Sequence, residues 1–158
     1  MILYFLLTAA FIAADQLIKL WALRVLRPMG TMEFLPGILR WTYVENRGAA
    51  FGIFAGQRWI LSLVSLLVVA ACFWLLWKKK FSSRMENICI ALIAAGGMGN
   101  LIDRVLRGFV VDYIDINELF SYPMFNLADC CVVVGAVMFA VLSFLSDRKR
   151  KETEDRSE

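Results

Sequence analysis

The sequence of 158 residues contains no histidine. This absence excludes Ser-His-Asp and Cys-His nucleophilic catalysis, HExxH zinc sites and proton relays built on histidine. The cysteines form no recognisable motif. The four cysteines lie in apolar runs without a CxxC pair, which excludes a disulfide-stapled module and favours buried thiols. Acid–base chemistry in this chain must therefore use Asp, Glu, Lys, Tyr or Cys.

Charged residues are few beside the apolar ones. Hydrophobic residues make up 60% of the chain, against roughly 45–50% in soluble proteins. A soluble domain of this size could not bury so much apolar surface, so the composition predicts an integral membrane protein. The net charge of +3 comes largely from short basic clusters, which bear on membrane orientation rather than on nucleic-acid binding.

Long apolar runs account for most of the chain, and a helix needs about 20 mostly apolar residues to cross a bilayer. The sequence predicts an all-α membrane protein with one domain, residues 1–147, and a charged tail, residues 148–158. The first span lacks the basic start and the small-residue cleavage site of a signal peptide, which is its alternative interpretation. We expect four transmembrane helices, at residues 1–23, 59–77, 86–104 and 125–146.

Two connections, residues 24–58 and 105–124, fall on the same side of a four-span protein. In the first, TMEFLPGILRWTYVENRG is typical of two short strands around a turn at Pro36 and Gly37. We expect a small antiparallel sheet in this loop, lying on the outer membrane surface; an irregular loop is the alternative. The second connection begins like a strand, and its NELF segment could form one helical turn before Pro123.

Lysine and arginine set the expected orientation. They are dense in the connection at residues 78–84, KKKFSSR, and in the tail after Asp147. The positive-inside rule places both segments and both termini in the cytoplasm. The connections 24–58 and 105–124 are then extracytoplasmic.

Polar residues within the spans gather toward the extracytoplasmic end, and such residues are functional candidates by default. Asp15 and Lys19 are spaced i, i+4 and can pair on one helix face. The chain shows no polar trail toward the cytoplasmic side, which a transporter would need. The polar positions at this end are Asp15, Lys19, Asn46, Asn100, Asp103, Arg104, Asp112, Asn126 and Asp129.

Two carboxylates are the natural catalytic unit in a chain without histidine. An ionised Asp can take a proton from water while a protonated partner polarises a carbonyl, because close like charges force their pKa values apart. The rival unit is Ser-Lys, but the serines of the second span have no lysine alongside. The residues alone do not select the pair among Asp15, Asp103, Asp112, Asp115 and Asp129.

Five segments together resemble the motif set of lipoprotein signal peptidase, the bacterial type II signal peptidase. They occur in the order of that family, cover nearly the whole chain up to the tail, and are specific as a set although each is weak alone. The segments are DQLIK (15–19), NRGAAFG (46–52), GGMGNLIDR (96–104), VVDYI (110–114) and FNLAD (125–129).

The resemblance implies an aspartyl endopeptidase of the bacterial inner membrane that cuts diacylglyceryl-modified prolipoproteins just before the lipidated cysteine. It implies that Asp112 and Asp129 are the catalytic pair, that no metal or cofactor is used and that globomycin inhibits the enzyme. The expected partners are prolipoprotein substrates and membrane lipid, not nucleic acid, and we expect a monomer. The residues that fall on active-site surroundings or supporting positions are Asp15, Lys19, Asn46, Gly48, Asn100, Asp103, Arg104, Asn126 and Ala128.

Two interpretations of other classes remain. A small ion or solute carrier would need a polar path through the bilayer, and a non-enzymatic scaffold would tolerate single Asp substitutions. Two positions also differ from the family pattern or compete with it. Tyr113 stands where Phe is common, and Asp115 is a second acidic residue in the loop that carries Asp112.

Overall fold

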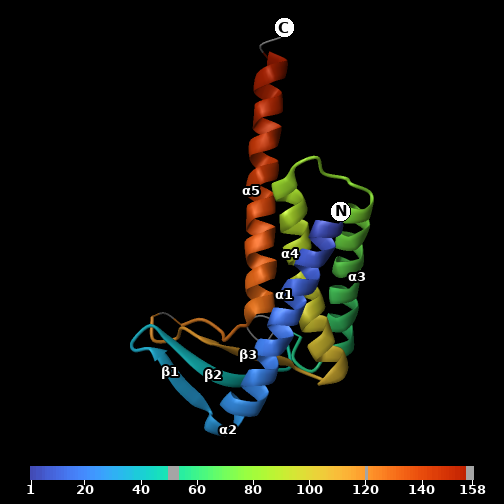
Figure 1. The fold of residues 1–158 in the computed structure, drawn as a ribbon. Helices are drawn as coiled ribbons and strands as arrows, with labels where there is room; N and C mark the ends of the chain where they lie inside the picture. Colours follow the sequence, from blue (N-terminus) through green and yellow to red (C-terminus); the bar gives the residue numbers. More distant parts are fainter. Residues whose placement is uncertain (50–53, 120, 156–158) are drawn as a thin grey trace.

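The computed structural model describes residues 1–49, 54–119 and 121–155. Four long helices stand side by side, and a small sheet lies across one end of the bundle (Figure 1). Within the described residues, four helices are long and apolar enough to cross a membrane, as predicted. They are α1 (Ile2–Trp21), α3 (Arg58–Trp77), α4 (Arg84–Leu106) and α5 (Leu127–Asp155).

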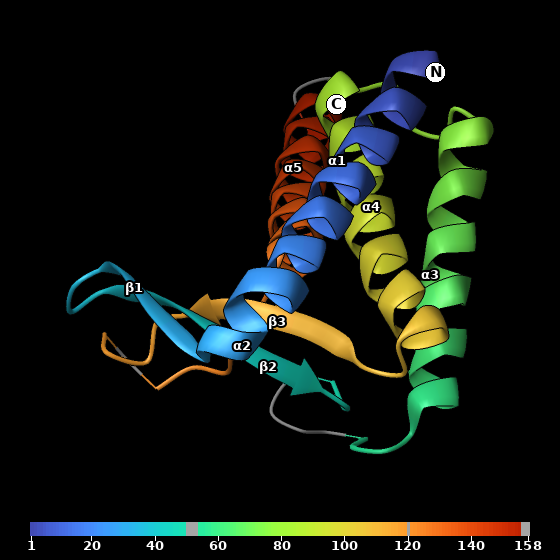
Figure 2. The same ribbon diagram turned by 60° about the horizontal axis from the view of Figure 1, so that its bottom comes forward.

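Helix α4 is the centre of the bundle and packs against α1, α3 and α5 (Figure 2). Glycines make its contact with α5 close. A Cβ atom added at Gly96 would run into the carbonyl oxygen of Ala128, and one at Gly135 would lie 2.8 Å from the carbonyl oxygen of Cys89. Small residues of this kind let helix backbones approach closely in lipid. The first turn of α5 is thereby held against α4.

The first helix runs further than the sequence predicted. After α1 the chain continues through a π-helical turn, Ala22–Leu26, and a last short helix, α2 (Arg27–Met29). The arginines and the proline in this stretch are typical of a loop, yet the helix ends only at Gly30, whose φ of 81° suits glycine. Its backbone N–H donates to the carbonyl of Leu26 at 2.7 Å. The extra turns carry the helix as far as the sheet.

The sheet contains three antiparallel strands in the order β1-β2-β3. Strands β1 (Thr31–Leu35) and β2 (Leu39–Asn46) form the predicted hairpin around Pro36 and Gly37. Strand β3 (Val110–Asp115) comes from the other connection and pairs with β2, with Val44 opposite Asp112. The predicted sheet is confirmed, but it joins both loops instead of belonging to the first alone.

An apolar cluster fixes the sheet to the end of the first helix. Ala22 and Leu26 are fully buried against Val111 and Tyr113 of β3. Trp21 packs edge-on against Trp41 of β2, with ring centroids 5.9 Å apart. The π-helical turn therefore supplies the surface on which β2 and β3 rest, and that surface sets the position of Asp112, between Val111 and Tyr113.

The chain from β3 to α5 returns along β3. Phe125 pairs with Ile114, each backbone N–H donating to the other's carbonyl at 3.2 and 2.8 Å. This pairing brings Asn126, the residue that precedes α5, next to the strand. In the NELF segment, Asn117–Leu119 form a turn rather than a helix, and Phe120 lies outside the described residues.

Helix α5 continues to Asp155, well beyond the predicted span (Figure 1). The stretch from residue 148 was predicted as a charged tail, but charge alone does not end a helix. Its Lys, Arg and Glu residues are good helix formers, and the stretch contains neither glycine nor proline. As far as Asp155, the charged segment is therefore an extension of the transmembrane helix.

Candidate active site

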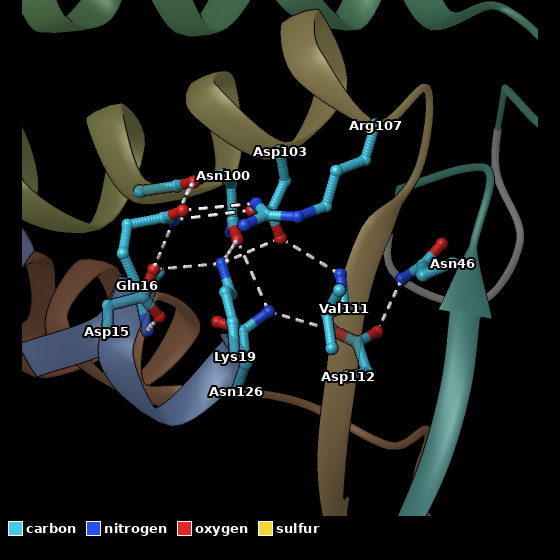
Figure 3. A network of polar contacts seen from close by, with 12 residues as sticks. Asp15, Gln16, Lys19, Asn46, Asn100, Asp103, Arg107, Val111, Asp112 and Asn126 are labelled. Carbon is cyan, nitrogen blue, oxygen red and sulfur yellow. Dashed lines mark hydrogen bonds and ion pairs between the residues drawn. The ribbon is translucent and has the colours of Figure 1, made fainter. Parts of the chain in front are cut away.

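Asp112 lies in β3 and is 1% exposed. Asn46 Nδ2 donates to one of its carboxylate oxygens at 2.8 Å, and Asn126 Nδ2 donates to the other at 2.7 Å (Figure 3). Burial raises the pKa of Asp112 to about 7, and the negative charge of Asp129 adds to the rise against the two amide hydrogen bonds. The carboxyl group can therefore carry or release a proton near neutral pH.

Asp129 lies in the first turn of α5 and forms a reciprocal cap with Asn126. The backbone N–H of Asp129 donates to Asn126 Oδ1 at 3.0 Å, and the backbone N–H of Asn126 donates to Asp129 Oδ2 at 3.1 Å. This is the hydrogen-bond pattern of a capping box, built here from Asn and Asp. Asn100 Nδ2 of α4 donates to the other oxygen, Asp129 Oδ1, at 2.7 Å.

Asn126 links the two carboxylates. Its side chain is fully buried, and its amide nitrogen donates to Asp112 Oδ1 and to Asn100 Oδ1, the latter at 3.2 Å. Its amide oxygen accepts the N–H of Asp129. Both ends of the carboxamide are thus engaged, which fixes its orientation. The Asn126 side chain therefore fixes the position of Asp112 relative to Asp129.

An ionic network of Asp15, Lys19, Asp103 and Arg107 lies beside Asp112 (Figure 3). The ammonium of Lys19, which is 0% exposed, contacts Asp15 Oδ2 at 2.9 Å and Asp103 Oδ2 at 3.1 Å. Its third hydrogen bond goes to Asn100 Oδ1 at 3.0 Å. Arg107 pairs with Asp103, so the charges of two carboxylates, Asp15 and Asp103, are balanced by two cations, Lys19 and Arg107. The predicted pairing of Asp15 with Lys19 is confirmed.

The two acids of this network also hold the backbone beside each candidate catalytic residue. Asp103 Oδ2 accepts the N–H of Val111 at 3.0 Å, immediately before Asp112. Asp15 Oδ1 accepts the N–H of Ala128 at 3.1 Å, immediately before Asp129. The network therefore positions β3 and the start of α5 relative to each other.

Gly99 makes room for this arrangement. A Cβ atom there would lie 2.5 Å from Asp15 Oδ2 and 3.2 Å from the Cβ of Ala128. Any side chain larger than hydrogen would push Asp15 away from Lys19.

Arg104 and Gly48 complete the set from the sequence prediction. Arg104 donates to the carbonyl of Gly48 at 3.3 Å, and the N–H of Gly48 donates to Asn46 Oδ1 at 2.9 Å. These bonds join the end of β2 and the residues just after it to α4. Residues 50–52, the last three of the NRGAAFG motif, lie outside the described residues.

Asp115 is occupied by structural contacts. It pairs with Arg40 at 3.2 Å and accepts hydrogen bonds from Thr42 at 2.9 Å and from the backbone and side chain of Asn117. Burial opposes ionisation, but these donors and the arginine outweigh it and lower the pKa of Asp115. A carboxylate held ionised in this way is a poor proton carrier at neutral pH.

Two cavities border Asp129. The first, of about 350 Å³, lies between α3, α4 and α5 and is lined at one end by Asn46, Asn100 and Arg104. The second, of about 370 Å³, lies beside Ile116 and Val134. The arrangement can therefore place a substrate bond at two carboxylates, buried Asp112 and partly exposed Asp129, next to apolar space.

Comparison with known proteins assigns the family. Residues 7–145 match the family model described as Signal peptidase (SPase) II. The chain belongs to the signal peptidase II family. It is thus a multi-pass membrane protease of a family that removes signal peptides from prolipoproteins, and the resemblance found in the sequence is confirmed.

Relatives and solved structures agree with this family. A lipoprotein signal peptidase of Clostridium acetobutylicum is 41% identical over 147 residues, which cover 92% of this chain and 96% of the relative. One of Listeria welshimeri is 37% identical over 149 residues, 94% of this chain and 97% of the relative. A bacterial membrane enzyme solved by the in meso method at 2.3 Å resolution has a TM-score of 0.85 and 30% identity, covering 94% of this chain and 90% of its own.

The structure brings the predicted site residues of this signal peptidase II family member together at one end of the bundle. Sequence reasoning left Gln16, Gly99 and Arg107 out of the site. Gln16 Nε2 donates to Asp15, to the carbonyl of Gly99 and to Asp103, and its oxygen accepts from Arg107. Arg107 follows Asp103 by four residues at the end of α4, and this spacing was the available signal.

Proposed function

We propose that this chain is an aspartyl endopeptidase that cuts diacylglyceryl-modified prolipoproteins just before the lipidated cysteine. The observation that carries the proposal is the pair of carboxylates joined through Asn126, with the pKa of Asp112 at about 7. Near neutral pH such a pair holds one proton between two carboxyl groups. That is the state that acid–base hydrolysis of a peptide bond requires.

In the proposed reaction, the ionised carboxylate of the pair takes a proton from a water molecule as the water oxygen attacks the scissile carbonyl carbon. The protonated partner donates its proton to the carbonyl oxygen, giving a neutral gem-diol. When the C–N bond breaks, the leaving amine takes a proton from a carboxyl group and the diol hydroxyl returns one. The pair ends with one proton, as it began.

The orientation of the site follows from the basic residues. The α3–α4 connection, with Lys78, Lys79 and Lys80, lies at the end of the bundle opposite the sheet (Figure 1). The positive-inside rule assigns this end and both termini to the cytoplasm. Asp112, Asp129 and the sheet then lie at the extracytoplasmic face of the bacterial inner membrane, where a lipidated precursor presents its cysteine. Cysteine labelling from outside should reach a probe in 31–45 and miss one in 78–84.

A cleavage assay tests the proposed function. The purified protein should cut a diacylated prolipoprotein, seen as a gel shift, and should leave the same precursor intact when its cysteine is not lipidated. Globomycin, bound in the substrate site, should block the cut. Cleavage of both precursors at equal rates, or no cleavage of either by the folded protein, would contradict the proposal.

A further inference from the structure

Lysine and arginine are separated between the two ends of the bundle. In the connections at the sheet end, residues 24–58 and 105–124, every basic residue is an arginine, whereas the stretch 78–84 at the opposite end is rich in lysine. A guanidinium is weakly hydrated, stacks on aromatic rings and binds phosphate through two parallel hydrogen bonds, which an ammonium cannot do. The sheet end is therefore suited to contacts with rings and with phosphate groups.

Two of these arginines lie over aromatic rings. The guanidinium carbon of Arg47 is 5.6 Å from the centroid of the Phe109 ring, and that of Arg58 is 4.5 Å from the centroid of the Trp59 ring. A ring covers one face of a guanidinium and leaves its edge, which carries the N–H donors, open to an anion. Stacking therefore fixes the positions of these two cations without neutralising them.

The fold brings both stacked arginines to the same turn. The N–H of Gly56 donates to the carbonyl of Arg47 at 3.0 Å, which draws together the two ends of the chain between Arg47 and Arg58. Phe109, beneath Arg47, follows Gly108, and a Cβ atom added at Gly108 would lie 3.3 Å from Arg58 Nη1. Arg47, just after β2, and Arg58, at the start of α3, therefore flank the turn that joins α4 to β3 (Figure 2).

Carboxylates neutralise this pair of arginines only in part. Arg47 contacts Glu45 at 3.0 Å, but Glu45 also pairs with Arg27 at 3.3 Å, so one negative charge serves two arginines. Arg58 donates to the carbonyl of Val105 at 2.9 Å, and among the described residues no carboxylate forms an ion pair with it. Cations held at one turn repel each other. An anion between the two guanidiniums would offset that repulsion.

Exposed apolar side chains place the turn at the level of lipid headgroups. Val105 and Leu106, at the end of α4, are 45% and 75% exposed, and Trp59, in the first turn of α3, is 69% exposed. Apolar side chains so exposed on transmembrane helices require lipid around them, and tryptophan is typical of the membrane interface. The arginines lie directly beyond these side chains, at the height where phosphate groups border the hydrocarbon core.

We propose that Arg47 and Arg58 form a binding site for the phosphate group of an anionic phospholipid. The phosphate lies between the two guanidiniums at the α4–β3 turn, and the acyl chains run along Val105, Leu106 and Trp59 into the bilayer. Inorganic phosphate would gain the same hydrogen bonds but none of the apolar contacts, so the lipid is the ligand that the surroundings favour. The site contains no candidate catalytic residue, and the inference therefore does not rest on the proposed function.

Binding of phosphatidylglycerol to the purified protein in neutral detergent tests this site. The measurement is the dissociation constant of the tightest bound lipid, obtained by native mass spectrometry. One variant combines Arg47→Gln with Arg58→Gln and removes both guanidiniums, and a second combines Arg47→Lys with Arg58→Lys and keeps the charges alone. The charge-matched control combines Arg24→Gln with Lys78→Gln, at two exposed positions outside the site.

We expect the double glutamine variant to bind phosphatidylglycerol about tenfold more weakly or worse, because charge-assisted hydrogen bonds to the phosphate are lost. The double lysine variant should recover only part of this loss, and the control should bind as the unmodified protein does. Unchanged binding by the glutamine variant, an equal loss in the control, or displacement of the lipid by an excess of inorganic phosphate would overturn the proposal.

Unfolding followed by tryptophan fluorescence shows whether each variant is folded. If the double glutamine variant does not fold, the double lysine variant decides, because it keeps both positive charges and loses the planar fork. It should still bind phosphatidylglycerol more weakly than the unmodified protein. Equal binding by the lysine variant in that case would overturn the site.

Discussion

Lys19 is the buried cation on which the site's geometry depends, and replacing it by glutamine has a cost that can be worked out from its contacts. Its ammonium serves Asp15, Asp103 and Asn100. Without it, Asp103 still has Arg107 and the N–H of Val111. Asp15 keeps only neutral donors, from Gln16 and Ala128. The loss therefore falls on Asp15, which becomes a buried carboxylate without a cation.

Breaking a buried ion pair by removing one partner costs about 3–5 kcal/mol. We expect Lys19→Gln to lower the free energy of unfolding by that amount. Asp15→Asn in the same protein removes the unpaired charge, so the double variant should recover about 1–3 kcal/mol relative to the sum of the single changes.

The assay is unfolding in mixed detergent micelles followed by tryptophan fluorescence, for the four proteins of the double-mutant cycle. Lys78→Gln, at an exposed lysine in the α3–α4 connection, is the control and should leave the unfolding free energy unchanged. Additive costs for Asp15→Asn and Lys19→Gln, with no coupling energy, would refute this account of the network.

Three further predictions concern the same site. The rise in the pKa of Asp112 from 3.8 to about 7 favours the protonated folded state, so this contribution, about 4 kcal/mol, is complete below pH 4 and is lost as the pH rises through 7. The measurement is the unfolding free energy as a function of pH for the unmodified protein and for Asp112→Asn. Only the unmodified protein should show the loss, and parallel pH curves for the two proteins would contradict the prediction. Gly99→Ala should displace Asp15 and abolish most cleavage, and unchanged kcat/KM would show that the close approach is unimportant. Asn126→Ala should cost about 1 kcal/mol of unfolding free energy as a lost cap. Its loss in kcat, expressed as activation free energy, should be far larger, because the change also releases Asp112 from Asp129. Equal losses in the two free energies would assign Asn126 a capping role alone.

The sequence was sufficient for the features that depend on local pattern. The four spans followed from apolar runs, the hairpin from its Pro-Gly turn, and the Asp15–Lys19 pair from i, i+4 spacing. Each of these depends on residues close together in the chain. Hydropathy and turn chemistry report on such neighbours directly.

Non-local features were harder to predict. Strand β3 joins the sheet by pairing with β2, about seventy residues earlier, and no local pattern specifies that pairing. The choice between Asp112 and Asp115 depends on it as well. The two residues are three positions apart on one strand, so they point to opposite faces, and only the fold places Arg40 at Asp115 and Asn126 at Asp112. The family motifs, not the residues themselves, indicated Asp112.

Glycine and asparagine gave the weakest signals. Gly99 is in the site because Asp15 of another helix passes beside it, and Asn126 is central because its two ends reach different elements. The contacts of these residues with other elements leave no trace in local spacing, which records only the capping pair of Asn126 and Asp129, three residues apart. The π-helical turn after α1 also escaped prediction, because its arginines are typical of a loop whereas its buried Ala22 and Leu26 depend on the sheet above them.

Cleavage by the aspartate variants tests the central claim most directly. Asp→Asn keeps the shape of the side chain and removes the titrating proton, so Asp112→Asn and Asp129→Asn should each abolish the gel shift of a diacylated prolipoprotein while the protein stays folded in detergent. The double variant should be no worse than either, because the two act as a unit. Asp115→Asn is the matched control and should keep much of its activity. Near-normal cleavage by both Asp112→Asn and Asp129→Asn, or an inactive Asp115→Asn beside an active Asp112→Asn, would contradict the account.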